Sequence, residues 1–433
     1  MSFSSNVETG IKEKTVASQN GVDGGTDAKG STKASSKRGG WGRVFRGKAY
    51  EERLSLEESL KMVVTKSESP PSVLVNETSL ALSSEYLWLS HLFPAGTVDK
   101  LFAKEHLGNY LIVRSTGEKI FETMPIYARI GMHLLFYGPL QIRLLRWKTL
   151  RNLLKTESIR QGKIYDSTDP EVVRTQITAF VTTYNINVAE LLEPDLKAYK
   201  TFNQFFSRRL RPDARPPASP DDSSVIVSCA DCRLTVWPNW SLARKIWVKG
   251  RHFTLSSLLK DRKLSRSLGK HPSLAIFRLA PQDYHRFHSP VFAVLQGIKH
   301  IDGEYYTVNP QAVNEKLDVL SGNVREIATY EATASSANDD TKSQVKIPVA
   351  IVAVGALLVG SVGWDKKVGE TVPKGDGLGY FQYGGSTVIV VLPGSDVAGM
   401  HVRWDDDLVK NSEGVLETLV RAGERIGQFV SKQ

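Results

Sequence analysis

The chain has 433 residues, of which 41% are hydrophobic and 24% charged, and its formal net charge is +10. This composition is that of a globular chain with room for two or three domains. Two cysteines exclude a disulfide-based scaffold and suit a reducing compartment. The first thirty residues are polar and include Glu8, Glu13, Asp23 and Asp27, so we expect neither a secretory signal nor a mitochondrial transit peptide.

Residues 1–80 are expected to form a largely disordered, basic tail. Residues 28–48 contain seven Lys or Arg and no acid, and they include Trp41 and Phe45. Such a segment is typical of a solvated tail. It is equally typical of a segment that binds anionic lipid, where each basic residue near the membrane surface contributes about 1 kcal/mol to binding. Nucleic acid is not expected as a partner, because the rest of the chain has no recognisable binding motif.

Residues 81–200 have a mainly helical pattern. Within them, 124–155 is apolar, aromatic and basic at once, and it has a stripe of large apolar residues at helical spacing that Arg151 interrupts. A helix that packs in a core and a helix that lies on a membrane surface both fit this pattern. Next, Thr201 to Gln204 form a capping-box pattern, which predicts a helix over 202–210 that Pro212 ends.

After a Pro-rich connector at 211–222, the pattern becomes mostly β as far as about residue 400. Residues 347–364 are uncharged over 18 residues, which is near the length of a membrane span. They are rich in β-branched residues and contain Gly355, Gly360 and Gly363, so we predict two buried strands joined by a bend and no transmembrane helix.

The glycine pair Gly384–Gly385 lies between two short runs of aromatic and β-branched residues, which is typical of a two-residue hairpin turn. The preceding residues 368–382 alternate turn residues with apolar ones, as lipoyl- and biotinyl-type β domains do. Such domains carry a modifiable lysine at their hairpin, whereas this turn presents Ser386. A carrier domain is therefore disfavoured.

These patterns predict an α+β fold, with a helical N-terminal region followed by a β-rich catalytic domain of hybrid or lipoyl-like β-sandwich character. The predicted divisions are a disordered tail at 1–80, a helical, membrane-proximal region at 81–200 and the β-rich catalytic domain at 201–433.

Two motifs contain residues suited to chemistry. His285 and His288 are three residues apart, but no further Cys or His cluster completes a metal site, so no metal is predicted. The two histidines then have either a structural role or a role in general acid–base catalysis. Cys229 and Cys232 have Cys-x-x-Cys spacing in a strand-like context, whereas redox chemistry uses this motif at a helix N-terminus.

Asp231 lies between these cysteines, among strand-forming residues. A buried carboxylate is costly without a partner, and a histidine from another loop would serve. Asp231, His288 and Ser386 are thus the residue types of an Asp–His–Ser triad.

In combination these motifs resemble the phosphatidylserine decarboxylases, pyruvoyl-dependent lipid enzymes, over about residues 120 to 395. The likeness is greatest to the eukaryotic subgroup with Gly-Gly-Ser-Thr and without a C2 domain. The matching blocks are KTFNQFF at 200–206, CADCRL at 229–234, VKGRHFTLSSLL at 248–259, DYHRFHSPV at 283–291, GEYYTVNPQAV at 303–313, KGDGLGYF at 374–381 and YGGST at 383–387.

The resemblance implies that the chain cuts itself between Gly385 and Ser386. The serine hydroxyl attacks the glycine carbonyl to give an ester, elimination leaves dehydroalanine, and hydrolysis with loss of ammonia gives an N-terminal pyruvoyl group, the only cofactor expected. It further implies that His288 is the base, that Asp231 orients it, and that His285 transfers a proton during decarboxylation.

The implied function is conversion of phosphatidylserine to phosphatidylethanolamine and CO2 through a pyruvoyl Schiff base, by two chains that remain associated. A peripheral enzyme is expected on the cytoplasmic side of an internal membrane such as Golgi or endosome, and a homo-oligomer is compatible with the sequence. The alternatives are a pyruvoyl-dependent decarboxylase of a free aromatic L-amino acid and a non-catalytic, membrane-associated relative. Lipid-contact residues are not predicted.

Overall fold

The computed structural model describes residues 108–123, 162–246, 253–304, 319–338, 343–355, 361–383 and 386–431. They belong to one compact unit that starts at Glu52. The predicted basic tail, the apolar and basic segment 124–155 and the pair Gly384–Gly385 lie outside the described residues, so the structure does not test what was predicted for them.

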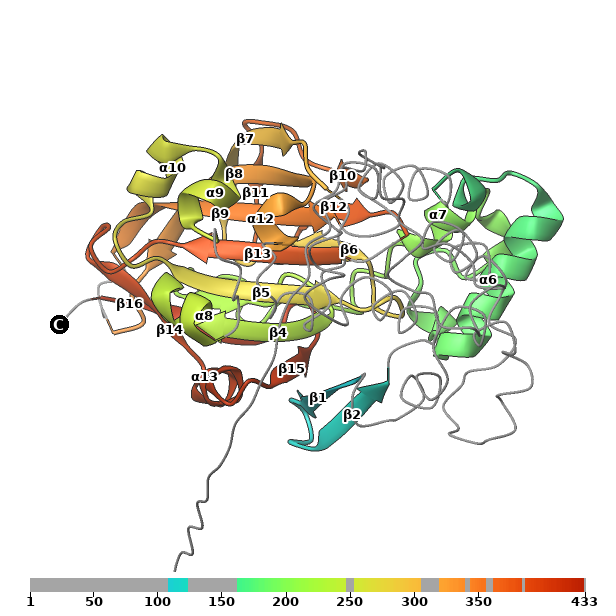
Figure 1. Ribbon diagram of the computed structural model, residues 1–433, viewed down its shortest axis with the longest axis horizontal. Coiled ribbons are helices and arrows are strands. Elements are labelled where there is room, and N and C mark those ends of the chain that lie inside the picture. Colours follow the sequence, from blue (N-terminus) through green and yellow to red (C-terminus); the bar gives the residue numbers. More distant parts are fainter. Residues whose placement is uncertain are drawn as a thin grey trace, which may run out of the picture. The chain divides into compact units, whose positions relative to one another are not determined.

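A ten-stranded sheet forms the centre of the described unit (Figure 1). Its strands are antiparallel to their neighbours except for β1 and β15, which run parallel. In spatial order they are β11 (Thr371–Val372), β7 (Ala293–Ile301), β8 (Arg325–Ser335), β9 (Gln344–Gly355), β13 (Ser386–Leu392), β5 (Ser273–Leu279), β4 (Cys232–Trp237), β15 (Glu417–Val420), β1 (Gly108–Val113) and β2 (Lys119–Thr123).

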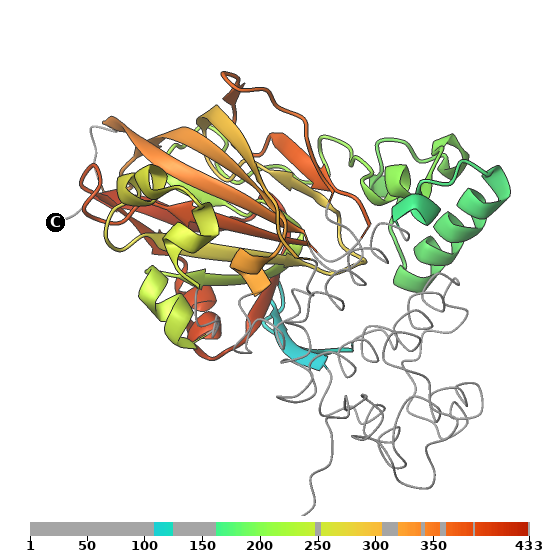
Figure 2. The same cartoon turned by 45° about the horizontal axis from the view of Figure 1, so that its top comes forward.

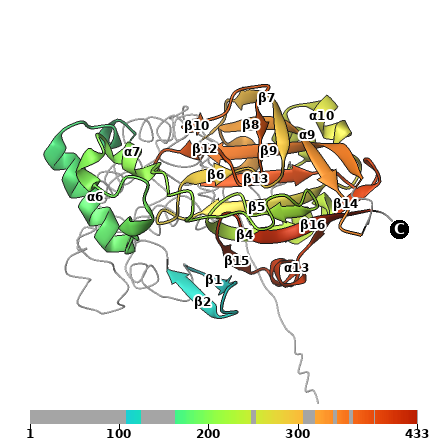
Figure 3. The same cartoon turned by 180° about the vertical axis from the view of Figure 1, so that it is seen from behind.

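Two three-stranded sheets accompany the large one (Figure 3). The first has the order β10 (Val362–Trp364), β12 (Gly377–Phe381) and β6 (Arg286–His288), and the second has the order β14 (Met400–Trp404), β16 (Arg425–Ser431) and β3 (Val225–Val227).

The helices within the described residues are short, apart from α6. They are α6 (Pro170–Tyr184), α7 (Phe202–Phe206), α8 (Trp240–Ile246), α9 (Leu255–Leu259), α10 (Arg262–Ser267), α12 (Val319–Gly322) and α13 (Asp406–Glu413), with 3-10 turns η5 (Val188–Glu190) and η6 (Leu196–Ala198).

The large sheet buries both of its faces, because alternate residues of its strands belong to two different hydrophobic clusters. On one face, Ile276 and Ile389 pack with residues of the helical segments, among them Trp240 and Leu258. On the other face, the strands pack with residues of the small sheets. The architecture is therefore helices, large sheet and small sheets in layers, and the predicted α+β class is confirmed.

Residues 108–123 differ from the prediction, because they form a β-hairpin within the region predicted to be helical (cyan in Figure 2). Gly117 in its turn has a φ of 71°, which favours glycine. The hairpin joins the sheet through β15, about 300 residues along the chain, and such a partner leaves no trace in local periodicity.

The helix predicted over 202–210 begins as expected but ends early. Thr201 accepts a hydrogen bond from the Gln204 N–H at 3.1 Å and caps α7. After Phe206 the chain leaves the helix, and Leu210 forms an isolated antiparallel bridge with Leu191.

The strands predicted within 347–364 are present as β9 and β10, and the residues between them, 356–360, are outside the described part. No helix in the described ranges is both long and apolar enough to cross a membrane.

The predicted hairpin around Gly384–Gly385 is wrong. β12 pairs with β10 and β6, whereas β13 pairs with β5 and β9 in the large sheet. The two strands that flank the glycines thus belong to different sheets.

Candidate active site

The segment just before Gly384 is held by three hydrogen bonds from its backbone N–H groups, two to carbonyls and one to a side chain. The Phe381 N–H donates to the His285 carbonyl at 2.9 Å, and the Gln382 N–H donates to the Ser361 carbonyl at 3.2 Å. The Tyr383 N–H donates to Asn203 Oδ1, in α7, at 2.9 Å. These bonds fix the chain on the amino-terminal side of the glycine pair.

An aromatic cluster adds to this anchoring. The Tyr383 ring lies 4.3 Å from Tyr165, 5.5 Å from Phe202 and 5.0 Å from Phe206, measured between ring centroids. Phe206 also contacts the His285 ring at 4.0 Å. Helix α7 thus connects the segment before the glycines to one of the two predicted catalytic histidines.

Ser386 begins β13 on the other side of the glycine pair. It is 1% exposed, and it pairs with Leu279 of β5 and Gly355 of β9. The strand that follows is buried over its whole length. Because ladders flank it on both sides, the position of Ser386 is set by the centre of the sheet.

His288 has a defined tautomer. Its Nδ1 lies 2.8 Å from the Gly375 carbonyl, which can only accept, so Nδ1 carries the proton. Its Nε2 lies 3.2 Å from the Tyr284 hydroxyl, which donates to the ring lone pair. Burial lowers the pKa of His288, and the Gly375 carbonyl and the charge of Asp231 oppose that effect. The ring is neutral near pH 7 and can accept a proton at Nε2.

His285 is fully buried and has the same tautomer, with Nδ1 donating to the Asp283 carbonyl at 3.0 Å. Its Nε2 has no hydrogen-bond partner. Burial lowers its pKa to about 3, and the positive charges of Arg208 and Arg233 add to the shift. His285 therefore presents an unprotonated nitrogen inside the protein.

Asp231 has the charged partner that its burial requires, but the partner is an arginine and not a histidine. It accepts from Arg215 Nε at 2.9 and 3.0 Å, from Arg215 Nη2 at 2.7 Å, and from the Ala422 N–H at 2.9 Å. The structure brings Asp231 within electrostatic reach of His288 without a hydrogen bond between them. Arg215 lies in the Pro-rich connector, where no sequence pattern indicated this role.

A backbone hydrogen bond joins the loop that contains Asp231 to the histidine segment, because the His288 N–H donates to the Cys229 carbonyl at 2.7 Å.

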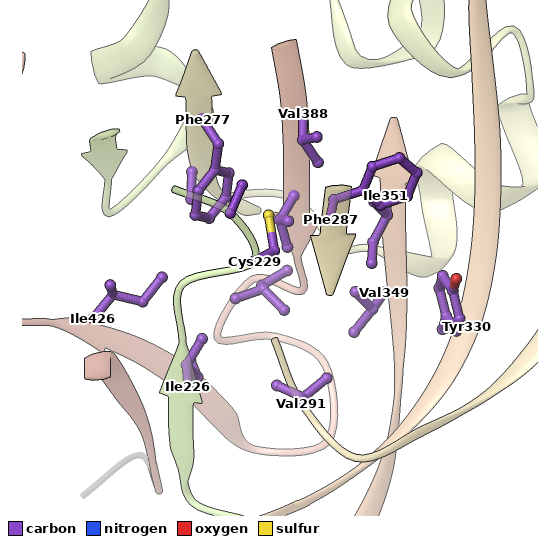
Figure 4. Packing of buried hydrophobic residues seen from close by; sticks show 14 of the residues in the cluster. Ile226, Cys229, Phe277, Phe287, Val291, Tyr330, Val349, Ile351, Val388 and Ile426 are labelled. Atoms are coloured by element: carbon purple, nitrogen blue, oxygen red, sulfur yellow. The ribbon is translucent and has the colours of Figure 1, made fainter. Parts of the chain in front are cut away.

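Cys229 and Cys232 are buried free thiols, and burial raises the pKa of both. Cys229 lies in the core cluster with Phe277 and Val388 (Figure 4). These thiols contribute to packing. Within the described ranges no cluster of three or more His, Cys, Asp or Glu could hold a metal ion.

Replacing Arg215 by Met is expected to lower the free energy of unfolding by about 3 kcal/mol, because the partly buried Asp231 carboxylate then keeps only the Ala422 N–H and Glu190 also loses its ion pair with Arg215. Urea unfolding of the two proteins measures the change. The control is Arg211→Met, which breaks an exposed pair with Asp213 and should cost less than about 1 kcal/mol. An equal decrease in the free energy of unfolding in both variants would show that the Arg215–Asp231 pair stabilises the protein no more than an exposed ion pair does.

Comparison with known proteins finds phosphatidylserine decarboxylases, the family that the sequence motifs resemble. The family described as phosphatidylserine decarboxylase matches residues 202–428. The chain is 37% identical over 341 residues to phosphatidylserine decarboxylase proenzyme 2 of Saccharomyces cerevisiae, covering 78% of this chain and 28% of that protein. It is 40% identical over 318 residues to proenzyme 3 of Schizosaccharomyces pombe, covering 73% of this chain and 30% of that protein.

A bacterial relative is matched over most of its length. The phosphatidylserine decarboxylase proenzyme of Ruminiclostridium cellulolyticum is 32% identical over 292 residues, which is 66% of this chain and 91% of that protein. By contrast, the match spans only about a third of the length of the fungal relatives.

Proposed function

Because this chain belongs to the phosphatidylserine decarboxylase family, we propose that it is a self-processing enzyme that converts phosphatidylserine to phosphatidylethanolamine and CO2. The observation that carries the proposal is the setting of Ser386. The chain before Gly384–Gly385 is bonded to α7 and to the His285 carbonyl, and Ser386 begins a central strand. These contacts anchor Tyr383 on one side of the glycine pair and Ser386 on the other, and such restraint would favour attack by the serine hydroxyl on the preceding carbonyl.

In the self-cleavage, His288 accepts the Ser386 proton at Nε2 as the Tyr284 hydroxyl turns its hydrogen away from that nitrogen. The carbonyl of Gly375 keeps the other ring nitrogen protonated, and Tyr284 orients the ring by its hydroxyl. Asp231 acts through its negative charge, which favours the protonated form of His288, and Arg215 and the Ala422 N–H hold this carboxylate in place.

The residues at the start of β13 fit a pyruvoyl group derived from Ser386, because the new chain end remains buried and held by strands on both sides. Such a group supplies an electrophilic carbonyl for the substrate amine and an acceptor for the electrons left by CO2. His285 moves the proton: its buried Nε2 takes one from the substrate and then returns it to carbon, and the pKa that burial lowers makes the protonated ring a strong donor in the second of these steps.

The two chains stay associated after cleavage in this proposal. The first strand of the small chain, β13, lies between β9 and β5 of the large chain, and β16 of the small chain pairs with β3. We further propose peripheral attachment to the cytoplasmic side of an internal membrane, as the lipid substrate requires. Kinship of the β-rich part with hybrid or lipoyl-type sandwiches also stays a proposal, supported by the small sheets that pack on the large one.

The test is release of CO2 by the purified, processed protein from phosphatidylserine vesicles and from free L-tryptophan. We expect release from the lipid alone. Release from tryptophan alone would favour the decarboxylase of free aromatic amino acids. A processed protein inactive on both would favour a non-catalytic relative.

A further inference from the structure

Arg208 is a buried cation with few partners. The residue is 4% exposed, and it lies just after α7 with its guanidinium over the Phe205 ring, 5.2 Å from the centroid. Its hydrogen bonds are long: Nη1 donates to the Phe206 carbonyl at 3.4 Å and Nη2 to the Asp283 carbonyl at 3.3 Å, while Nε has no partner. Burial lowers the pKa of Arg208 to about 10, which leaves it charged near pH 7.

The nearby carboxylates do not neutralise this charge, because other arginines bind them. Asp231 is held by Arg215, and Asp283 is held by Arg233 and by the Ala280 N–H. Among the described residues, Arg208 forms no ion pair. A buried cation without an anion is costly, and an anionic ligand at this position would offset that cost.

His285 lies beside Arg208, since Nδ1 of His285 and Nη2 of Arg208 donate to the same Asp283 carbonyl. The other ring nitrogen of His285, Nε2, has a lone pair without a hydrogen-bond partner among the described residues. The Nε–H of Arg208 likewise has no acceptor among them. One buried acceptor and one buried charged donor thus belong to two side chains that share the Asp283 carbonyl. A ligand that satisfies both has a protonated amine and an anion.

We propose that Arg208 binds the phosphodiester of the substrate headgroup while the amine lies toward His285. This inference rests on the proposed function for the identity of the headgroup, which contains a phosphodiester, an amine and a carboxylate. Arg208 would then make the site selective for a phospholipid headgroup over a free amino acid, because the free amino acid lacks the phosphate.

The charge changes during decarboxylation favour the phosphate over the carboxylate as the group bound by Arg208. The carboxylate loses its negative charge as CO2 forms, so a cation bound to it stabilises the substrate more than the transition state and slows the reaction. The phosphodiester keeps its charge throughout. A guanidinium on the phosphate therefore adds affinity and orientation without raising the barrier.

The test measures binding without turnover, in Ser386→Ala protein, by titration calorimetry with glycerophosphoethanolamine, ethanolamine and L-serine. Glycerophosphoethanolamine has the phosphodiester and the amine without the carboxylate. We expect Arg208→Met to weaken its binding roughly 10- to 100-fold, with Arg208→Lys in between. The matched control is Arg209→Met, which removes the same charge one residue along from an exposed side chain and should change nothing.

Three results would overturn the assignment. One is unchanged binding of glycerophosphoethanolamine by Arg208→Met or, if that variant does not fold, by Arg208→Lys. Another is a loss of L-serine binding alone, which would place the carboxylate at Arg208. The third is no saturable binding of glycerophosphoethanolamine to Ser386→Ala protein. Failure of the proposed function would appear separately, as absence of CO2 release by the unsubstituted protein.

Discussion

Ser386→Ala is expected to leave a single chain of 433 residues, while the unsubstituted protein separates into chains of 385 and 48 residues. The serine hydroxyl is the nucleophile in the proposed cleavage, and alanine has no group to replace it. The cleavage rate should fall by more than roughly a thousandfold. Intact-mass measurement over a long incubation follows the reaction, and the 48-residue chain should have a blocked N-terminus with a carbonyl that reacts with hydroxylamine.

Thr387→Val is the matched control for this loss. Thr387 follows Ser386 in β13, is equally buried, and has a hydroxyl without a hydrogen-bond partner. Removing that hydroxyl should leave cleavage intact. Unsubstituted protein that stays at full length would contradict both enzyme hypotheses, and an uncut Thr387→Val protein would show that the hydroxyl of Ser386 alone does not explain the reaction.

The two histidines are expected to separate the two reactions. His288→Ala should remain uncut, because Ser386 then has no base at its proposed position. His285→Ala should cut itself and yet release no CO2, because its Nε2 handles the proton only in the second reaction. Intact mass reports the first step, and CO2 release per pyruvoyl group reports the second.

The pH dependence follows from the direction of the His288 shift. Its pKa lies below the ordinary value of 6.5, and the neutral ring is the active form, so the cleavage rate should be constant around neutral pH and fall only as the pH drops below 6.5. His300→Ala is the control and should leave this pH profile unchanged, since His300 is half exposed and bonded to Glu326 and Asp302.

A different outcome of the two histidine variants would reverse the assignment. If His285→Ala blocks cutting and His288→Ala does not, the roles of the two histidines are exchanged.

The sequence alone was sufficient for the features that depend on neighbouring residues. The Thr201 cap of α7, the strands at each end of 347–364 and the strand formed by the β-branched run after the glycine pair follow from local hydrogen bonding, β-branched composition and glycine positions. Ser386 itself was expected in a turn from the sequence, whereas the structure places it in the strand. The motif residues Asp231, His285, His288 and Ser386 were also found in the sequence, because their residue types and blocks are specific. Their roles remain proposals.

Only the tertiary structure decided which distant residues meet. Periodicity could not show that β12 and β13 belong to different sheets, because strand pairing depends on partners far away in the chain, and a glycine pair permits a hairpin as readily as a crossing between sheets. The same limit applies to charges. Asp231 pairs with Arg215 from a connector. Arg208 has no anion among the described residues, because the nearby carboxylates form ion pairs with other arginines. Ion pairing is settled by which side chains are buried together, and the order of residues along the chain does not contain that information.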